Sequence, residues 1–162
     1  MALTSKVGYF NRVLDELIKL NLSKKDVFLL FGPIDILVRI SEIKDLDEFI
    51  KKWFNPIRNI TPQEPMIDKT QTFIVFSEGK QFKEEPYAFL FLNTHPRNIE
   101  QVQEALQNIS QVLSADIVFG PYDIICAVRA KDRLDLQQLI SRIQKEIPNI
   151  QGTMSEIVAA LY

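Results

Sequence analysis

The sequence lacks the features that identify secreted and membrane proteins. Cys126 is the only cysteine, so an internal disulfide is excluded, and the single thiol is typical of a cytoplasmic protein. No apolar run approaches the ~18 residues of a membrane helix. Residues 1–6 do not have the layout of a signal peptide. We therefore expect a cytoplasmic protein with no membrane partner.

The sequence also has little that indicates catalysis or nucleic-acid binding. Its net charge is −2 and its pI is about 5.5, which do not suit a phosphate-binding surface. Phosphate-binding glycine loops, metal-ligand clusters and nucleophile elbows are absent. The one histidine, His95, lies between an expected strand and helix, where a structural role is more common than a metal-binding or basic one. We expect no cofactor, no metal, no direct nucleic-acid partner and no catalytic residue.

A ten-residue segment that occurs twice organises the rest of the chain. Residues 31–40 read FGPIDILVRI and residues 119–128 read FGPYDIICAV, which are identical at five of ten positions. A repeat of this length indicates two copies of one supersecondary unit. The predicted organisation is a first repeat at 1–76, a linker at 77–86 and a second repeat at 87–162.

Amphipathic helices are expected before and after each copy of this segment. Downstream, apolar residues recur at intervals of three and four, which predicts a helix with one buried stripe. The stripe residues are Leu46, Phe49, Ile50, Trp53 and Ile57 in the first copy, and Leu136, Leu139, Ile140, Ile143 and Ile147 in the second. Each copy is therefore predicted to run βαββαβ, an α+β pattern.

Most of the expected strands are continuously apolar, which is typical of strands covered on both faces. Residues 28–31, 73–76 and 87–92 hardly alternate between apolar and polar. Two helices cover only one face of a four-stranded sheet, so the other face needs a cover of similar character. We expect the two repeats to pack sheet to sheet as a pseudo-dimer, and incompletely covered surfaces to drive self-association.

The Gly-Pro-x-Asp turn is the motif with chemical promise. Proline presets φ for the second position of a turn, and glycine leaves the backbone open to a ligand. Asp35 and Asp123 either accept hydrogen bonds from nearby backbone N–H groups, as turn caps, or accept one from the ammonium or amide group of a ligand. The sequence leaves both interpretations open.

Residues 87–162 resemble the effector-binding and oligomerisation (RAM) domain of the Lrp/AsnC family. The matching phrases are the strand AFLFLNT from Ala88, the turn GPYDI from Gly120, the phrase IPNI from Ile147 and the closing strand from Thr153. The resemblance implies ferredoxin-like units of the dimeric α/β-barrel type. It implies a stand-alone tandem form, because the chain has no room for the family's N-terminal helix-turn-helix domain. The first repeat resembles the family only through the internal repeat.

The resemblance also implies a ligand site. Family members bind effectors, usually amino acids, in a crevice lined by the turn and the closing strand, where dimers meet in a larger assembly. Carried over, the ligand-binding residues of the second repeat are Gly120, Pro121, Tyr122, Asp123, Thr153 and Ser155. Those of the first are Gly32, Pro33, Ile34, Asp35, Thr70 and Thr72. The implied function is non-catalytic amino-acid sensing related to transcription regulation, through self-association or association with full-length Lrp/AsnC regulators.

The first repeat departs from the family pattern in two ways. Ile34 stands where the turn aromatic is expected, and its opening strand would begin before Met1 if the spacing of the repeat held. Residues 2–7 must supply a short first strand, or another chain must. Two alternatives remain for the whole protein: a small ferredoxin-like enzyme resembling monooxygenases, and an assembly scaffold without a ligand.

Overall fold

The computed structural model describes residues 1–60 and 63–159 and shows an α+β fold, as the pattern predicts. The chain divides into two compact units, one built on Met1–Thr72 and one on Phe73–Val158. Residues 73–86, expected to form the end of the first repeat and a linker, group with the second unit. The sheet-to-sheet packing of the two repeats stays a prediction.

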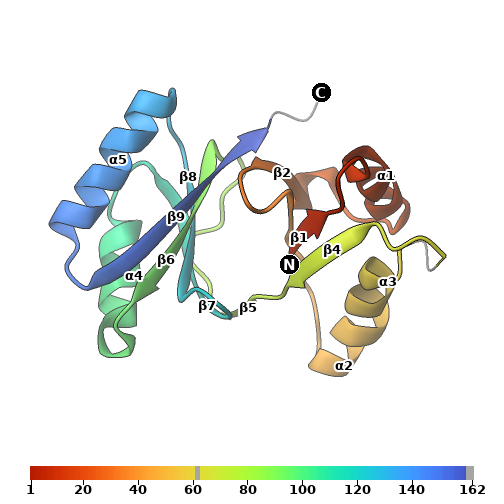
Figure 1. The fold of residues 1–162 in the computed structure, drawn as a ribbon. Helices are drawn as coiled ribbons and strands as arrows, with labels where there is room; N and C mark the ends of the chain where they lie inside the picture. The colour runs from red at the N-terminus through yellow and green to blue at the C-terminus, as the bar shows by residue number, and fades with distance from the viewer. Residues whose placement is uncertain (61–62, 160–162) are drawn as a thin grey trace. The chain divides into compact units, whose positions relative to one another are not determined.

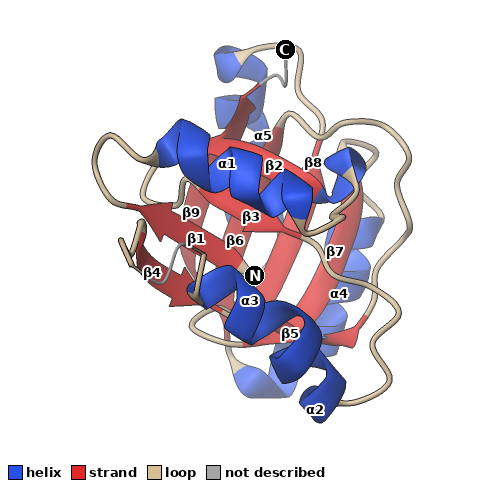
Figure 2. Ribbon diagram, turned by 90° about the vertical axis from the view of Figure 1, so that its right-hand side faces the viewer, coloured by secondary structure: helices blue, strands red, loops and turns tan. Residues whose placement is uncertain are grey.

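The first unit has the predicted βαββαβ order. Its antiparallel strands pair in the order β4-β1-β3-β2, and its α-helices lie on one face of them (Figures 1 and 2). The chain itself supplies the short first strand, which pairs with β3 and β4. The elements are β1 (Ala2–Ser5), α1 (Phe10–Lys19), η1 (Lys24–Asp26), β2 (Val27–Phe31), β3 (Ile36–Val38), α2 (Leu46–Phe49), η2 (Ile50–Phe54), α3 (Asn55–Arg58) and β4 (Ile67–Gln71).

The second unit has the same order with one further strand at its edge. Its antiparallel strands pair in the order β9-β6-β8-β7-β5, and α4 and α5 lie on one face of this sheet (Figure 1). The elements are β5 (Ile74–Ser77), β6 (Ala88–Thr94), η3 (Pro96–Asn98), α4 (Ile99–Gln107), β7 (Val112–Phe119), β8 (Ile124–Val128), α5 (Arg133–Glu146) and β9 (Ile150–Ala159).

Alternate residues of the central strands form the core of the second unit. Leu90 and Leu92 of β6 point toward the helices, where they join Val102 of α4 and Leu139 of α5 in one buried cluster. The residue between them, Phe91, lies on the other face of the sheet and is also buried. Both faces of β6 are therefore buried, as its continuously apolar sequence predicts.

The predicted buried stripe is confirmed for α5 but wrong for Leu46 of α2 and Ile50 of η2. In α5, Leu136, Leu139 and Ile143 are all buried. In the first unit, by contrast, Leu46 is 59% exposed and Ile50 is 37% exposed.

Among the described residues, no helix combines the length and the apolar character needed to cross a membrane.

Helix capping explains why the two stripes differ. Asp45 and Asp132 each accept a hydrogen bond from the backbone N–H three residues later, at 2.8 and 2.9 Å, so each is the N-cap of its helix. These caps make Leu46 the equivalent of Arg133 rather than of Leu136. The first helical position is therefore Leu46 in the first unit and Arg133 in the second, and both side chains are exposed to solvent.

The prediction that residues 73–76 are covered on both faces is wrong. Ile74, Val75 and Phe76 of β5 are exposed, and so is Phe31 at the end of β2. β5 is the outer strand of the second unit. Phe31 lies two residues beyond Leu29, the last residue of β2 that pairs with β3. An apolar run therefore does not establish burial when the strand is at an edge.

The segment after β5 is held closely against β7. The side-chain Nε2 of Gln103 donates to the carbonyl oxygens of Ser77 (3.2 Å) and Ala115 (2.9 Å), and Gly79 N–H donates to Asp116 Oδ1 (2.6 Å). A Cβ at Gly79 would lie 2.5 Å from the backbone N and O of Ala115. Only glycine permits this approach of the two backbones.

We expect Leu139→Asp to unfold the second unit. Leu139 is 1% exposed in the core, so the substitution buries a carboxylate without a partner and should lower the free energy of unfolding by more than about 4 kcal/mol. Chemical denaturation followed by circular dichroism measures this change. Leu134→Asp, at a position of the same helix that is 63% exposed, is the control and should be neutral. A stable Leu139→Asp variant would contradict the assigned register of α5.

Gly79→Ala should destabilise the attachment of residues 77–79 to β7. The new methyl group meets backbone atoms that cannot rotate away, so we expect a loss of about 1–3 kcal/mol in the free energy of unfolding. Glu78→Ala, at the exposed neighbouring position, is the control. Equal stability of the two variants in a urea titration would show that the two backbones separate at little cost.

Candidate functional site

The turn of the second repeat is tied to the end of strand β6 by Asp123. The Asp123 carboxylate accepts a hydrogen bond from Thr94 N–H (Oδ2, 2.9 Å), and Asp123 N–H donates to the carbonyl oxygen of Leu92 (3.0 Å). Within the turn, Val118 N–H donates to the carbonyl oxygen of Asp123 (2.9 Å). The aspartate thus joins the β7–β8 turn to the neighbouring strand.

The first repeat has the same arrangement. Asp35 Oδ2 accepts from Ser5 N–H (2.6 Å) and from the Ser5 hydroxyl (2.8 Å), and Asp35 N–H donates to the carbonyl oxygen of Leu3 (3.1 Å). Leu30 N–H closes the turn on the Asp35 carbonyl oxygen (2.8 Å). The expectation that these aspartates accept backbone N–H groups is confirmed, but the donor belongs to the first strand of each repeat, β1 or β6, rather than to the turn.

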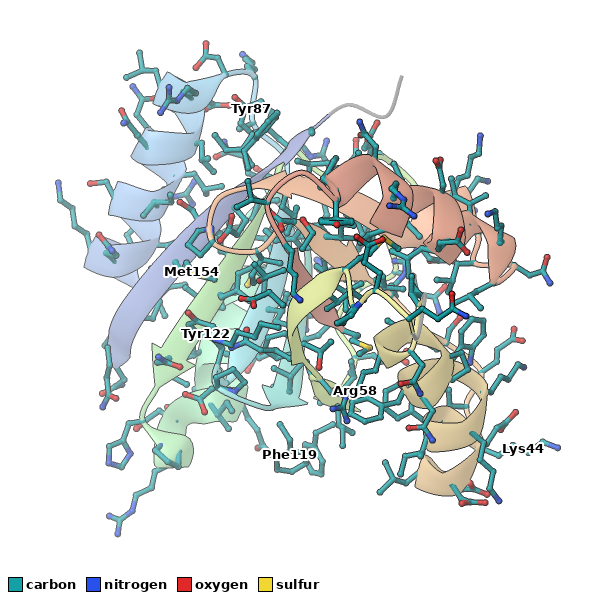
Figure 3. The ribbon with its side chains drawn as sticks, turned by 45° about the vertical axis from the view of Figure 1, so that its right-hand side comes forward. Lys44, Arg58, Tyr87, Phe119, Tyr122 and Met154 are labelled. Carbon is teal, nitrogen blue, oxygen red and sulfur yellow. The ribbon has the colours of Figure 1, made fainter. Side chains whose placement is uncertain are left out.

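Tyr122 belongs to an aromatic cluster on the face of the sheet opposite the helices. Its ring centroid lies 5.4 Å from that of Phe91 and 6.5 Å from that of Phe73, and the two phenylalanine rings are 5.9 Å apart. The Tyr122 hydroxyl donates to Met154 Sδ at 3.3 Å (Figure 3). These distances are typical of packed aromatic pairs. The Tyr122 side chain is nevertheless partly exposed to solvent.

The predicted residues of the closing strand do not join this cluster. Thr153 and Ser155 of β9 pair with Leu92 and Leu90, whose side chains face the helices, so both lie on the helix face of the sheet. Thr153 Oγ1 is buried without a hydrogen bond from the described residues, and Ser155 is exposed. Met154, which lies between them, is the residue of β9 that reaches Tyr122.

The turn of the first repeat has no equivalent cluster among the described residues. Gly32 and Pro33 are exposed, as Gly120 and Pro121 are in the second repeat. Ile34 is buried, and its aliphatic side chain has neither the ring nor the hydroxyl of Tyr122. The two repeats therefore share the aspartate and the exposed Gly-Pro pair but differ in the side chain between them.

Thr70 and Thr72 are the remaining predicted site residues. Thr70 of β4 pairs with Leu3, which belongs to the core of the first unit, so Thr70 lies on the core face of that sheet. Thr72 Oγ1 is buried without a hydrogen bond from the described residues. Neither hydroxyl has a hydrogen bond to the Gly32–Asp35 turn in the described part of the chain.

Three residues at the site escaped the sequence prediction: Phe73, Phe91 and Met154. The contact of Met154 with Tyr122 depends on the pairing of β6 with β9, in which Phe91 lies opposite Met154. Phe73 lies just before β5 and belongs to neither of these strands. The aromatic run from Tyr87 was a usable signal, since alternate residues of a strand share a face. The internal repeat does not predict the register between β6 and β9 that places Met154 next to Tyr122.

The two side chains with possible catalytic chemistry have other roles. His95 Nδ1 accepts a hydrogen bond from Arg97 N–H (3.3 Å), so the histidine caps the short helix η3. Burial, with a smaller contribution from Asp116, strongly raises the pKa of the Cys126 thiol, which keeps it protonated and unreactive. Within residues 1–60 and 63–159, no group of three or more His, Cys, Asp or Glu side chains could hold a metal ion.

Comparison with known proteins assigns the second repeat to a family. Residues 87–161 match the family described as the Lrp/AsnC ligand binding domain. The resemblance inferred for the second repeat is thereby confirmed. None of the curated proteins matches the chain.

Three solved structures are similar to this chain. Hypothetical protein PHS023 from Pyrococcus horikoshii is 32% identical, over 46% of this chain and 89% of that one, with a TM-score of 0.42. FFRP-DM1 is also 32% identical, over 45% of this chain and 96% of that one (TM-score 0.41). TTHA0845 from Thermus thermophilus is 24% identical, over 46% of this chain and 92% of that one (TM-score 0.42). Residues 87–161, nearly the whole of the second repeat, thus belong to the Lrp/AsnC ligand binding domain family.

Proposed function

We propose that the protein is a non-catalytic, cytoplasmic sensor of an amino acid, with its main ligand site at the Gly120–Asp123 turn. The observation that carries the proposal is the meeting of a carboxylate, an exposed Gly-Pro backbone and a partly exposed aromatic ring at one turn. Family membership supports a regulatory module that binds an effector. The identity of the effector as an amino acid rests on the resemblance.

Asp123 has the capacity to hold the ammonium group of such an effector. Its Oδ2 is occupied by Thr94 N–H, whereas its Oδ1 has no hydrogen bond from the described residues. A carboxylate has about four acceptor positions, so it can accept from an ammonium group while it remains attached to β6. Gly120 and Pro121 are exposed beside it, which leaves the backbone accessible to the ligand.

The apolar part of the effector would contact Tyr122 and Met154. Both are partly exposed, and the Tyr122 ring is already positioned by Phe91 and Phe73. A ring held in place loses little conformational entropy when a ligand packs on it. In the first repeat Ile34 is buried instead, so we propose that the Gly32–Asp35 turn binds the effector weakly or not at all.

In this proposal, effector binding acts on transcription through assembly. The protein would associate with itself or with full-length Lrp/AsnC regulators, and the effector would favour one assembly over another. A ligand shifts such an equilibrium only by its difference in affinity for the two states. Binding and assembly must therefore change together.

The structure also favours a second candidate, a scaffold without a ligand. Asp35 and Asp123 accept the same backbone hydrogen bond from the first strand of their repeats, although only one of their turns carries an aromatic residue. A purely structural role explains the aspartate in both repeats. The two candidates differ in whether any small molecule stabilises the protein.

Thermal denaturation in the presence of each of the twenty amino acids separates these candidates. A sensor should be stabilised by at least one of them, because a ligand that binds the folded state raises the melting temperature. Light scattering on each stabilising condition should show a change in assembly mass. The absence of any shift, with one unchanged mass, would support the scaffold.

Substitution of Asp123 tests the site itself. Asp123→Asn keeps an oxygen for Thr94 N–H but removes the charge that attracts an ammonium group, so we expect near-normal stability and no effector-induced shift. Asp123→Ala leaves Thr94 N–H without its partner and should cost about 1–3 kcal/mol in the free energy of unfolding. Asp35→Asn is the matched control and should keep the shift. A normal shift with Asp123→Asn would show that the turn is not the ligand site.

A further inference from the structure

The outer strand of the second unit exposes a cluster of large apolar side chains. Ile74, Val75 and Phe76 of β5 are 52%, 48% and 67% exposed, and Phe119 of the adjacent β7 is 61% exposed. Single exposed apolar residues are common on soluble proteins, but a contiguous group of them marks an interaction surface. We call these four residues the β5 edge.

Three of these four residues, Ile74, Phe76 and Phe119, lie together on one face of the sheet. Ile74 lies opposite Phe119 in the β5–β7 pairing, so the two side chains share a face of the sheet. The register shifts between Val75 and Ser77, and Phe76 packs edge-on against Phe119 with ring centroids 5.4 Å apart. Further along this face, Gln103 of α4 contacts Ser77, so the helical cover reaches only one end of β5.

The backbone of β5 is also available for pairing. Among the described strands of the second unit, β5 is the last in the order and pairs on one side only, with β7. Natural edge strands are commonly protected by lysine, proline, charge or a bulge. Residues 73–77, Phe-Ile-Val-Phe-Ser, contain no charged residue and no proline, so the bulge is the protection that remains.

We propose that the β5 edge binds the same edge of a second copy of this chain, as an antiparallel β5–β5 pair about a two-fold axis. A two-fold interface requires a surface that is complementary to itself. An axis at Val75 places Ile74 of one chain opposite Phe76 of the other, twice, and no like charges meet across residues 73–77. The pairing satisfies the open backbone groups of β5 in both chains.

This inference names the surface for the self-association in the proposed function, and to that extent it rests on that function. The effector site makes no use of the β5 edge residues. Their exposed positions also mean that substitutions there should leave the fold intact. The proposed β5 edge interface and the proposed effector site can therefore be tested separately.

Sedimentation velocity of the intact chain over a wide concentration range tests the pairing. We expect the wild-type protein to associate, and Ile74→Lys and Phe76→Lys each to weaken the dissociation constant by at least about tenfold. Leu134→Lys, which changes an exposed apolar residue on α5 of the same unit, is the matched control and should associate normally. Circular dichroism should show all four proteins folded.

A cross-link tests the predicted axis. Val75→Cys places two thiols opposite each other, because paired residues of antiparallel strands have Cα atoms about 4.5–5.5 Å apart, within the range of a disulfide. The native Cys126 is buried, so mild oxidation should give a disulfide dimer through position 75 alone. Leu134→Cys is the control and should remain uncross-linked.

Three results would overturn the inference: a wild-type chain that stays monomeric, an assembly that tolerates both lysine substitutions, or equal weakening by Leu134→Lys. If the amino-acid-induced thermal shift persists in Ile74→Lys while any of these is observed, the β5 edge is wrong and the effector site stands. A normal shift in Asp123→Asn, together with association that both lysine substitutions weaken, would show the opposite: the effector site is wrong and the β5 edge stands.

Discussion

The hydrogen bond from the first strand of each repeat, β1 or β6, to the turn aspartate is the constraint on which the rest of the structure depends. Asp35 and Asp123 each accept a backbone N–H at the end of the opening strand, and each donates its own N–H back to that strand. A buried or half-buried backbone donor left without its partner is costly, so the turn and the strand hold each other in register. The Gly-Pro pair is thereby presented to solvent at the same place in both units.

The two repeats use this common frame differently. In the second unit, Tyr122 follows the Gly-Pro pair and packs among Phe91, Phe73 and Met154, which produces a partly exposed aromatic surface beside a carboxylate. In the first unit, Ile34 occupies the position and is buried. The two turns can differ in this way because the aspartate's hydrogen bonds and the aromatic residue are separate features of the turn.

The prediction from sequence was most reliable where local rules decide the outcome. The repeat, the α+β pattern and the stripe of α5 follow from periodicity and turn chemistry, and all are present. Of the two sources left open for the first strand of the first repeat, the chain itself supplies it, at Ala2–Ser5. The stripe of α2 failed because N-capping by Asp45 sets where the helix begins, and this changes which face Leu46 occupies. Periodicity predicts that a helix has an apolar face, but the cap and the packing determine how much of it is covered.

By itself, the sequence determined the duplication, the two turns with their aspartates and the family resemblance of residues 87–162, because identical local patterns form identical local structures. The tertiary structure decided which side chains meet Tyr122, since Met154 reaches it only through the β6–β9 register, and a shift of one residue would have presented Thr153 or Ser155 instead. It also decided that the apolar strand β5 is exposed. Burial depends on a strand's neighbours in the sheet, and those neighbours are set by contacts between residues far apart in the chain.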